Sequence, residues 1–288
     1  MASELGKRVA VAAVGIPLAL IIIYLGGWPF TILLAIIAGI GAAEFYRLAA
    51  QRGVHAFVAL GAALAAGAVI LATVADDAAV TAAWSWRMFV AAALLVGPLA
   101  IFRRGVARAP LGATAVTIFG ALFTGGTLAY AVFLRELNVP ALDTAHARWV
   151  GPALVTFPLV MTWLSDTSAY FGGRTMGRRK LMPSVSPGKT VEGAVAGVIG
   201  TVLTGALYAH FVLGAWLGLP VTALFGALAG LIVSPVAQVG DLAESLLKRE
   251  AGVKDSGTLL PGHGGVLDRF DSLFFSIPVT YWLLLLVL

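Results

Sequence analysis

Nine runs of mostly apolar residues, each roughly long enough to cross a lipid bilayer, constrain the fold of this 288-residue chain more than any other feature. A transmembrane α-helix needs about 20 predominantly apolar residues, and a helix satisfies its own backbone polar groups inside the bilayer. The chain is therefore predicted to be an all-α polytopic membrane protein with about nine transmembrane helices and polar cytoplasmic active-site loops. The predicted spans are residues 8–25, 28–46, 55–75, 86–102, 111–134, 151–171, 192–213, 216–237 and 272–288.

Composition agrees with this fold class. Hydrophobic residues make up 60% of the chain and charged residues 11%, whereas charged residues are about 25% of a typical soluble domain. The chain has no cysteine, which excludes disulfides, thiolate metal sites and cysteine nucleophiles. We expect the net charge of +5 to reflect lysines and arginines retained on the cytoplasmic side, and we expect no nucleic acid as a partner.

The distribution of lysine and arginine predicts the orientation. With a cytoplasmic N-terminus, 16 of the 19 such residues lie in cytoplasmic segments, and only Arg87, Arg135 and Arg148 lie outside. The positive-inside rule favours this arrangement, which places the C-terminus outside. Lys7 and Arg8 precede the first apolar run as in a signal peptide, but this run leads directly into the second, so we expect a retained helix. The protein is expected in the cell (inner or plasma) membrane.

Residues that could carry chemistry lie mainly in the second half of the chain. Residues 1–150, with about five spans, form an N-terminal transmembrane region to which we assign no chemistry. Residues 151–288 form the predicted catalytic region, with polar cytoplasmic-face segments 163–193 and 240–271. Glu44 is an exception in the first region, since an acid near a helix end must pair or reach the interface. Arg47, three residues on, is its expected partner.

The segment 240–271 holds 10 of the chain's 33 charged residues. A helix over residues 241–248 would place four polar side chains on one face, at i, i+3, i+4 and i+7. Beyond this helix, a Pro-Gly-His-Gly-Gly turn at 261–265 leads to a second acidic pair three residues apart. Carboxylates hold Mg²⁺, while turn amides and cations neutralise phosphate oxygens, so this pattern indicates metal-assisted phosphate chemistry. The four helical residues are Asp241, Glu244, Ser245 and Lys248; the second acidic pair is Asp268 and Asp271.

The segment 163–193 adds a second set of polar residues on the same side. Asp166 lies near the inner end of an apolar run, where an acid is costly and by default functional; the alternative is an interfacial acid paired with Arg174. Gly172-Gly173 is predicted to end the helix. Residues 186–190 are predicted to form a tight turn that brings Lys189 to the start of the next helix, a plausible anion site. It is not a P-loop, because the GxxxxGK spacing is absent.

Together the two segments resemble the phosphatidate cytidylyltransferase (CDP-diacylglycerol synthase) family. The resemblance covers somewhat less than the C-terminal half, and the N-terminal spans match only as hydrophobic helices. Val191 departs from the pattern, since many members carry an aromatic residue there. The later matching residues are Ser245, Lys248-Arg249, Lys254-Asp255, Pro261, His263-Gly264-Gly265, Asp268-Arg269 and Asp271. The earlier ones are Asp166, Ala169-Tyr170, Gly173, Gly177, Ser186-Pro187, Lys189-Thr190, Glu192 and Gly193.

This resemblance implies a Mg²⁺-dependent nucleotidyltransferase of phospholipid biosynthesis. Phosphatidate and CTP would give CDP-diacylglycerol and pyrophosphate. Asp241 and Asp268 look like the family's Mg²⁺ ligands, and they are also expected to be catalytic, together with Lys248 and Lys189. Further candidates for the metal shell are Glu244, Asp271 and Asp166. The substrate-binding candidates are Ser186, Lys189, Ser245, Lys248, Arg249, Lys254, Gly262, His263, Gly264, Gly265 and Arg269.

Two other functions compete with this one. A CDP-alcohol phosphatidyltransferase also uses aspartates and Mg²⁺, but its DGxxAR…GxxxDxxxD pattern is missing. A transporter would place acids at mid-span in several helices, whereas these acids gather at one face of the membrane. The expected partners are CTP, phosphatidate and the bilayer. The sequence leaves open the acyl-chain preference, CTP versus dCTP, a second, monovalent cation, and the oligomeric state, for which a homodimer is one option.

Overall fold

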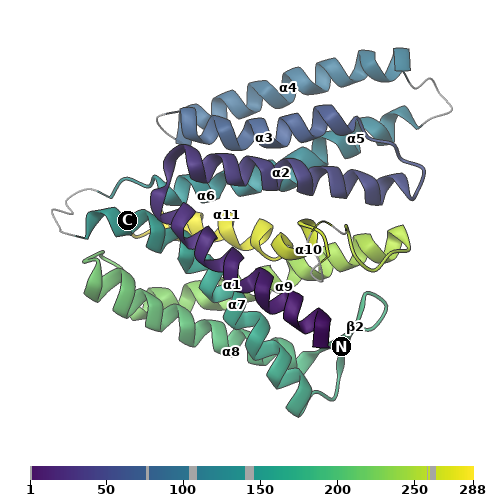
Figure 1. The fold of residues 1–288 in the computed structure, drawn as a ribbon. Helices are drawn as coiled ribbons and strands as arrows, with labels where there is room; N and C mark the ends of the chain where they lie inside the picture. Colours follow the sequence, from purple (N-terminus) through teal and green to yellow (C-terminus); the bar gives the residue numbers. More distant parts are fainter. Residues whose placement is uncertain (1, 76–77, 104–108, 140–145, 258, 260–263) are drawn as a thin grey trace. The chain divides into compact units, whose positions relative to one another are not determined.

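The computed structural model describes residues 2–75, 78–103, 109–139, 146–257, 259 and 264–288 (Figure 1). Within these residues the chain is helical apart from one short two-stranded sheet, which confirms the predicted fold class. Each of the nine predicted spans overlaps a described helix, although residues 217–222 of the span predicted at 216–237 are not helical. Five helical stretches are long and apolar enough to cross a membrane: Gly27–Ala50, Ala79–Arg103, Pro110–Arg135, Val191–Trp216 and Ala223–Ala251.

The helical elements are divided between the two halves of the chain. The first half contains α1 (Ala2–Leu25), α2 (Gly27–Ala50), α3 (Val58–Val74), α4 (Ala78–Arg103), α5 (Pro110–Ala121), the π-helix η2 (Leu122–Gly126) and α6 (Thr127–Arg135). The second half contains the 3₁₀-helix η3 (Ala147–Trp149), α7 (Val150–Met176), α8 (Val191–Leu207), the π-helix η4 (Tyr208–Trp216), α9 (Ala223–Ala251), α10 (Leu267–Phe270) and α11 (Leu273–Leu284).

The chain divides into two compact units, which differ from the functional regions predicted above; that functional division stays a prediction. The first unit comprises Met1–Phe133 and Leu247–Phe270, so the end of α9 and the segment after it belong with the N-terminal helices. The second comprises Leu134–Leu246 and Asp271–Leu288.

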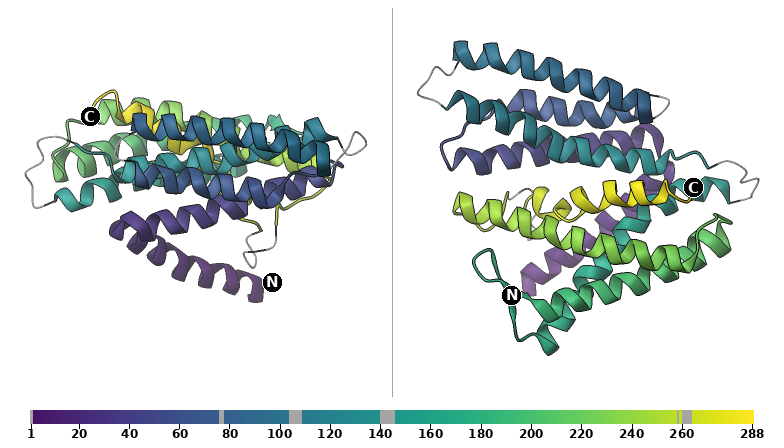
Figure 2. Two further views of the ribbon diagram at one scale, coloured as in Figure 1. Left: turned by 90° about the horizontal axis from the view of Figure 1, so that it is seen from above. Right: turned by 180° about the vertical axis from the view of Figure 1, so that it is seen from behind.

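Small residues allow the helices of the first unit to pack closely. Helix α2 packs along α3, and α5 contacts α2, α3 and α4; Figure 2 shows this group from two further sides. The fully buried Tyr46 of α2 donates a 2.7 Å hydrogen bond to the carbonyl oxygen of Thr117. A Cβ atom at Gly61 or Gly120 would collide with its ring. Small residues of this kind let helices approach in membranes, where apolar burial alone cannot hold them together.

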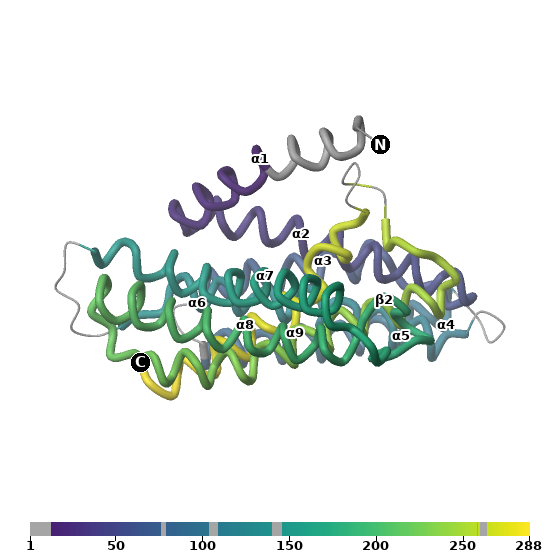
Figure 3. The backbone as a smooth tube through the Cα atoms, turned by 90° about the horizontal axis from the view of Figure 1, so that it is seen from below, coloured from purple at the N-terminus to yellow at the C-terminus, as the bar shows by residue number. Residues whose placement is uncertain are grey.

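The second unit is built around the pair α7 and α8, which lie side by side in the tube view of Figure 3. Helix α7 does not end at Gly172-Gly173 as predicted but continues to Met176. The reason is packing, because a side chain at Gly172 would collide with Ala196 of α8. Buried hydroxyl pairs add hydrogen bonds between helices, as Ser165 with Ser234 at 2.8 Å.

A β-hairpin connects α7 to α8. Strand β1 (Lys180–Met182) pairs antiparallel with β2 (Ser186–Thr190). The predicted tight turn at 186–190 is therefore wrong: these residues are a strand, and the turn lies at 183–185. The Thr190 side chain caps α8 by accepting a hydrogen bond from the Gly193 amide at 3.1 Å. Lys189, the residue before this cap, thus lies near the end of β2, two residues before α8 begins.

Helix α9 joins two predicted elements. The apolar span at 216–237 and the polar helix at 241–248 form one helix of 29 residues, which begins at Ala223. It ends where Gly252 adopts a φ of 74°, and the Val253 amide then donates to the carbonyl of Lys248. A glycine in this left-handed conformation is a common helix C-terminus.

Candidate active site

The first group of polar residues belongs to the second unit, where Lys189 meets Asp241. The Lys189 ammonium lies 2.6 Å from Oδ2 of Asp241, and both side chains are about a third exposed or less. Ser245, one turn further along α9, donates to the other carboxylate oxygen at 3.4 Å. The predicted polar face of this helix therefore carries an ion pair that water can reach.

A cavity of about 450 Å³ opens beside this pair. Its polar lining contains both signs of charge, while glycines and alanines of α7 and α8 supply much of the remaining wall. Arg174 does not pair with Asp166, as the alternative interpretation of that acid required, but donates to the Tyr170 hydroxyl at 2.9 Å. The polar lining residues include Asp166, Tyr170, Arg174, Lys189, Gln238 and Asp241.

Asp271, which precedes α11, adds another negative charge to this group. Its pKa is raised to about 7, because desolvation and the negative charges of Asp241 and Asp166 disfavour its ionised form. The Ser272 amide, which donates to Asp271 at 2.6 Å, offsets part of this rise. Three carboxylates near Lys189 and Arg174 still leave an excess of negative charge, the environment in which a hard cation such as Mg²⁺ is bound.

The carboxylates of this group are suitable ligands for a divalent cation, but in this structure they lie too far apart to bind one together. Among the described residues, no three histidine, cysteine or acidic side chains lie close enough together to hold a metal ion as they stand. Asp241 has its lysine partner at 2.6 Å instead. The assignment of Asp241, Asp166 and Asp271 to a Mg²⁺ shell therefore stays a prediction.

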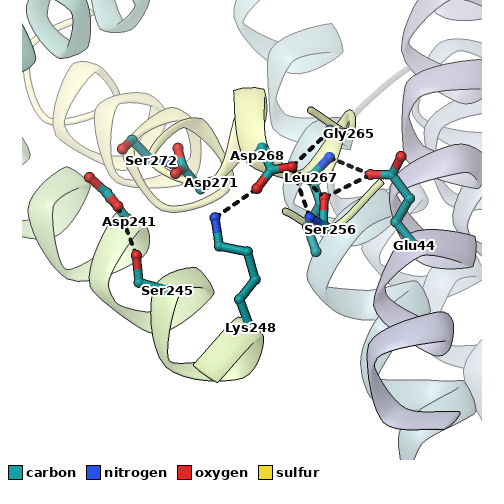
Figure 4. A network of polar contacts seen from close by, with 10 residues as sticks. All are labelled: Glu44, Asp241, Ser245, Lys248, Ser256, Gly265, Leu267, Asp268, Asp271 and Ser272. Carbon is teal, nitrogen blue, oxygen red and sulfur yellow. Dashed lines mark hydrogen bonds and ion pairs between the residues drawn. The ribbon is translucent and has the colours of Figure 1, made fainter. Parts of the chain in front are cut away.

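The second group belongs to the first unit and centres on Asp268. Lys248 contacts Oδ1 of Asp268 at 2.7 Å, with side chains only 13% and 5% exposed. The other oxygen, Oδ2, accepts hydrogen bonds from the Ser256 amide at 2.9 Å, the Ser256 hydroxyl at 2.9 Å and the Gly265 amide at 2.8 Å (Figure 4). Asp268 thus accepts hydrogen bonds from Ser256 and from Gly265, in addition to its predicted role as a metal ligand.

The glycine-rich part of this segment is explained by the same carboxylate. Gly264 has a φ of 81°, a conformation that side chains rarely adopt, and a Cβ there would press against the Asp268 carboxylate. Glycine is the residue that meets both conditions without strain. Gly264 and Gly265, which were predicted to bind a phosphate, therefore also lie close to the Asp268 carboxylate. Gly262 and His263 lie outside the described residues.

Glu44, in α2, was missed as a partner of this segment. It does not pair with Arg47, whose guanidinium donates to the carbonyl of Ala43. The fully buried Glu44 carboxylate instead accepts hydrogen bonds from Leu267 at 2.8 Å and from Ser256 at 3.2 Å. These bonds join residues more than 200 positions apart, so no local pattern could have revealed them.

The remaining predicted residues differ in exposure. Glu244 is fully buried on α9 and Ser186 is half-buried in β2. The structure thus forms two groups from the predicted residues, Asp241 with Lys189 and Asp268 with Lys248, and the joint role of these groups stays a prediction. Three substrate-binding candidates are exposed, namely Arg249, Lys254 and Arg269.

Comparison with known proteins gives matches along the whole chain. The model of the cytidylyltransferase family matches residues 6–287. A phosphatidate cytidylyltransferase of Synechocystis sp. is 35% identical, covering 98% of this chain and 97% of that protein. The chloroplastic phosphatidate cytidylyltransferase 4 of Arabidopsis thaliana is 36% identical over 97% of this chain and 73% of its own length. The Bacillus subtilis phosphatidate cytidylyltransferase is 38% identical over 58% of this chain and 56% of its own length.

Proposed function

This chain belongs to the cytidylyltransferase family, and we propose that it transfers CMP from CTP to phosphatidate, giving CDP-diacylglycerol and pyrophosphate. The observation that carries this proposal is the cavity beside Lys189 and Asp241, which combines carboxylates with cations. A site for two phosphate substrates and a divalent cation needs both.

The reaction is a displacement at phosphorus. A phosphate oxygen of phosphatidate attacks the α-phosphorus of CTP, the bond from that phosphorus to the bridging oxygen of the β-phosphate breaks, and pyrophosphate leaves with the electron pair. The attacking oxygen is already anionic near pH 7, so no general base is needed. The main barrier is the repulsion between two polyanions, and catalysis is therefore positioning and charge neutralisation.

The described residues can supply these effects. Lys189 and Arg174 line the cavity and are available to phosphate oxygens. Asp241, Asp166 and Asp271 are the residues that would hold Mg²⁺, which would supply positive charge to the phosphate oxygens. Asp268 would join this shell in the prediction from the sequence; in the structure its carboxylate pairs with Lys248.

The sidedness follows from the substrates and the distribution of charge. CTP is a cytoplasmic nucleotide, whereas phosphatidate stays in the membrane, so the reaction belongs at the cytoplasmic interface. We therefore propose a cytoplasmic N-terminus and an external C-terminus, supported by the excess of lysine and arginine in the segments assigned to the cytoplasm.

The test is an assay of the purified protein in detergent with phosphatidate, labelled CTP and Mg²⁺, scored for lipid-linked CMP and released pyrophosphate. Diacylglycerol replaces phosphatidate in one control, because it lacks the attacking phosphate. EDTA in place of Mg²⁺ tests the metal separately. Folded protein that forms no lipid-linked CMP from phosphatidate and CTP would refute the proposal.

A further inference from the structure

Glu44 is a buried acid that belongs to a region without assigned chemistry. Its side chain is fully buried in the first unit, and burying a charge is costly unless it is paired or hydrogen-bonded. Among the described residues, the two hydrogen bonds that Oε2 accepts come from the segment that follows α9: the Leu267 amide at 2.8 Å and the Ser256 hydroxyl at 3.2 Å. Figure 4 shows the carboxylate pointing from α2 at this segment.

The segment is shaped to receive this carboxylate. A Cβ atom at Gly257 would collide with Oε1 of Glu44, and one at Gly265 would collide with Oε2. Among the described residues Oε1 has no hydrogen-bond partner. Both glycines therefore leave room for an acid that comes from another helix, and the acid is held through one of its two oxygens.

Ser256 connects Glu44 to Asp268. Its hydroxyl lies 3.2 Å from the Glu44 carboxylate and 2.9 Å from that of Asp268. A hydroxyl has one proton, so it donates to one carboxylate at a time. The backbone amide of Ser256 donates to Asp268 as well, at 2.9 Å. The position of Ser256 thus depends on Glu44, and the position of the Asp268 carboxylate depends on Ser256.

We propose that Glu44 is a positioning residue for the reaction: it holds Ser256 and Leu267 in place and thereby fixes the Asp268 carboxylate and its Lys248 partner. This role rests on the proposed function. Glu44 is not a catalytic residue, because a fully buried side chain has no surface on which a substrate could bind. It acts through hydrogen bonds to a segment that carries candidate catalytic groups.

The chain offers a matched control two residues away. Tyr46 is as deeply buried on the same helix, but its hydroxyl bonds to the carbonyl of Thr117 in α5. The variant Tyr46→Phe removes one buried hydrogen bond and leaves the segment 256–267 untouched. A general loss of stability in the first unit therefore appears in both Tyr46→Phe and Glu44 variants, whereas a loss of positioning appears only in the latter.

The experiment combines steady-state kinetics with hydrogen–deuterium exchange of the full-length protein in detergent. Displacing reacting groups by about 1 Å can cost about 100-fold in rate, so Glu44→Ala should lower kcat by about this factor, with KM for CTP and phosphatidate much less changed. Exchange of the Leu267 amide should accelerate. Glu44→Gln keeps an acceptor oxygen and should recover much of the loss in both measurements, and Tyr46→Phe should resemble wild type.

Ser256→Ala is a smaller change that tests the same connection if Glu44→Ala does not fold. It removes the hydroxyl that lies between the two carboxylates, so it should also lower kcat. The hydrogen bond from the amide of residue 256 to Asp268 is kept. The inference is overturned if Glu44→Ala and Ser256→Ala keep the kcat of Tyr46→Phe, or if exchange at Leu267 is unchanged in Glu44→Ala. An inactive wild type would instead refute the proposed function, and the exchange measurement would still decide whether Glu44 holds the segment.

Discussion

Asp241 and Asp268 each pair with a lysine, but the two ion pairs lie in different environments. Asp241 and Lys189 are 31% and 27% exposed, whereas Asp268 and Lys248 are 5% and 13% exposed. Water screens the first pair, so its net contribution to stability is small. Breaking a buried pair costs more, because water does not readily replace the lost contact. The two aspartates should therefore respond differently to the same substitution.

Asp241→Asn is expected to abolish most activity with little change in the melting temperature. Losing a metal ligand or its supporting partner typically costs 10- to 100-fold or more, and the exposed Lys189 can be solvated. Asp268→Asn is expected to lose activity and also to destabilise the protein by about 1–3 kcal/mol, because it weakens the charge-assisted contacts of a carboxylate that is only 5% exposed. Activity and thermal unfolding of both variants in detergent check this. An Asp241→Asn variant that keeps more than about a tenth of wild-type activity at saturating Mg²⁺ would remove Asp241 from the proposed shell.

The raised pKa of Asp271 predicts how the free energy of unfolding depends on pH in the absence of metal. Its native pKa of about 7 lies above the ordinary value of 3.8. Between these values the native state binds more protons than the unfolded state, so stability is greatest below the lower value and falls as pH rises toward the upper one. The fall is at most about 1.4 kcal/mol per pH unit. Melting temperatures measured with EDTA at several pH values should decline across this window, and less steeply in Asp271→Asn. Identical pH dependence in both proteins would contradict the assignment.

At the scale of elements, runs of apolar residues predicted the helical fold, because a bilayer leaves the chain few alternatives to a helix. The errors lie where a local signal competes with packing. Gly172-Gly173 reads as a helix end, yet α7 continues because α8 approaches closely there. The Pro-Gly pair at 187–188 reads as a turn, yet it lies in a strand whose partner is β1. Both outcomes depend on a neighbouring element that the local sequence does not specify.

The contact between α7 and α8 should therefore be sensitive to volume. Gly172→Val places a side chain against Ala196, and overpacking of this kind typically costs about 1–3 kcal/mol. Gly188→Ala is the control, because a Cβ there has open space around it in β2. Thermal unfolding in detergent should show a clear loss for the first variant and almost none for the second. Equal melting temperatures would mean that the two helices can separate without cost.

At the scale of the whole chain, the polar residues of both C-terminal segments were predictable, since charged residues are rare in an apolar sequence and stand out. Their partners were not. Glu44 contacts Leu267 across 223 positions, and a helical pattern indicates which face a residue occupies but not what lies against it. The sequence therefore predicted Arg47, the nearest opposite charge, as the partner of Glu44. Burial of the carboxylate favoured a different solution, in which backbone and hydroxyl donors of a distant segment replace the arginine.

The membrane topology can be tested with single cysteines, because the chain has none of its own. Suitable positions must be exposed. Ser184, Asp255 and Glu136 meet this condition, whereas Ser256 is 6% exposed and would react poorly on either side. In the proposed orientation the hairpin and the segment after α9 are cytoplasmic, and the connection after α6 is external, since 16 of the 19 lysines and arginines then lie inside.

An impermeant thiol reagent applied to intact right-side-out vesicles should therefore label Glu136→Cys and leave Ser184→Cys and Asp255→Cys unlabelled until the membrane is permeabilised. Labelling after permeabilisation is the control that each cysteine can react. The reverse pattern in intact vesicles would invert the orientation. Labelling of all three would place position 136 on the same side as the two polar segments. The prediction that α7 crosses the membrane once between α6 and the hairpin would then be wrong, although this helix is 27 residues long. That result would require α7 to lie along the interface, and the exposed Asp166 would then be an interfacial acid.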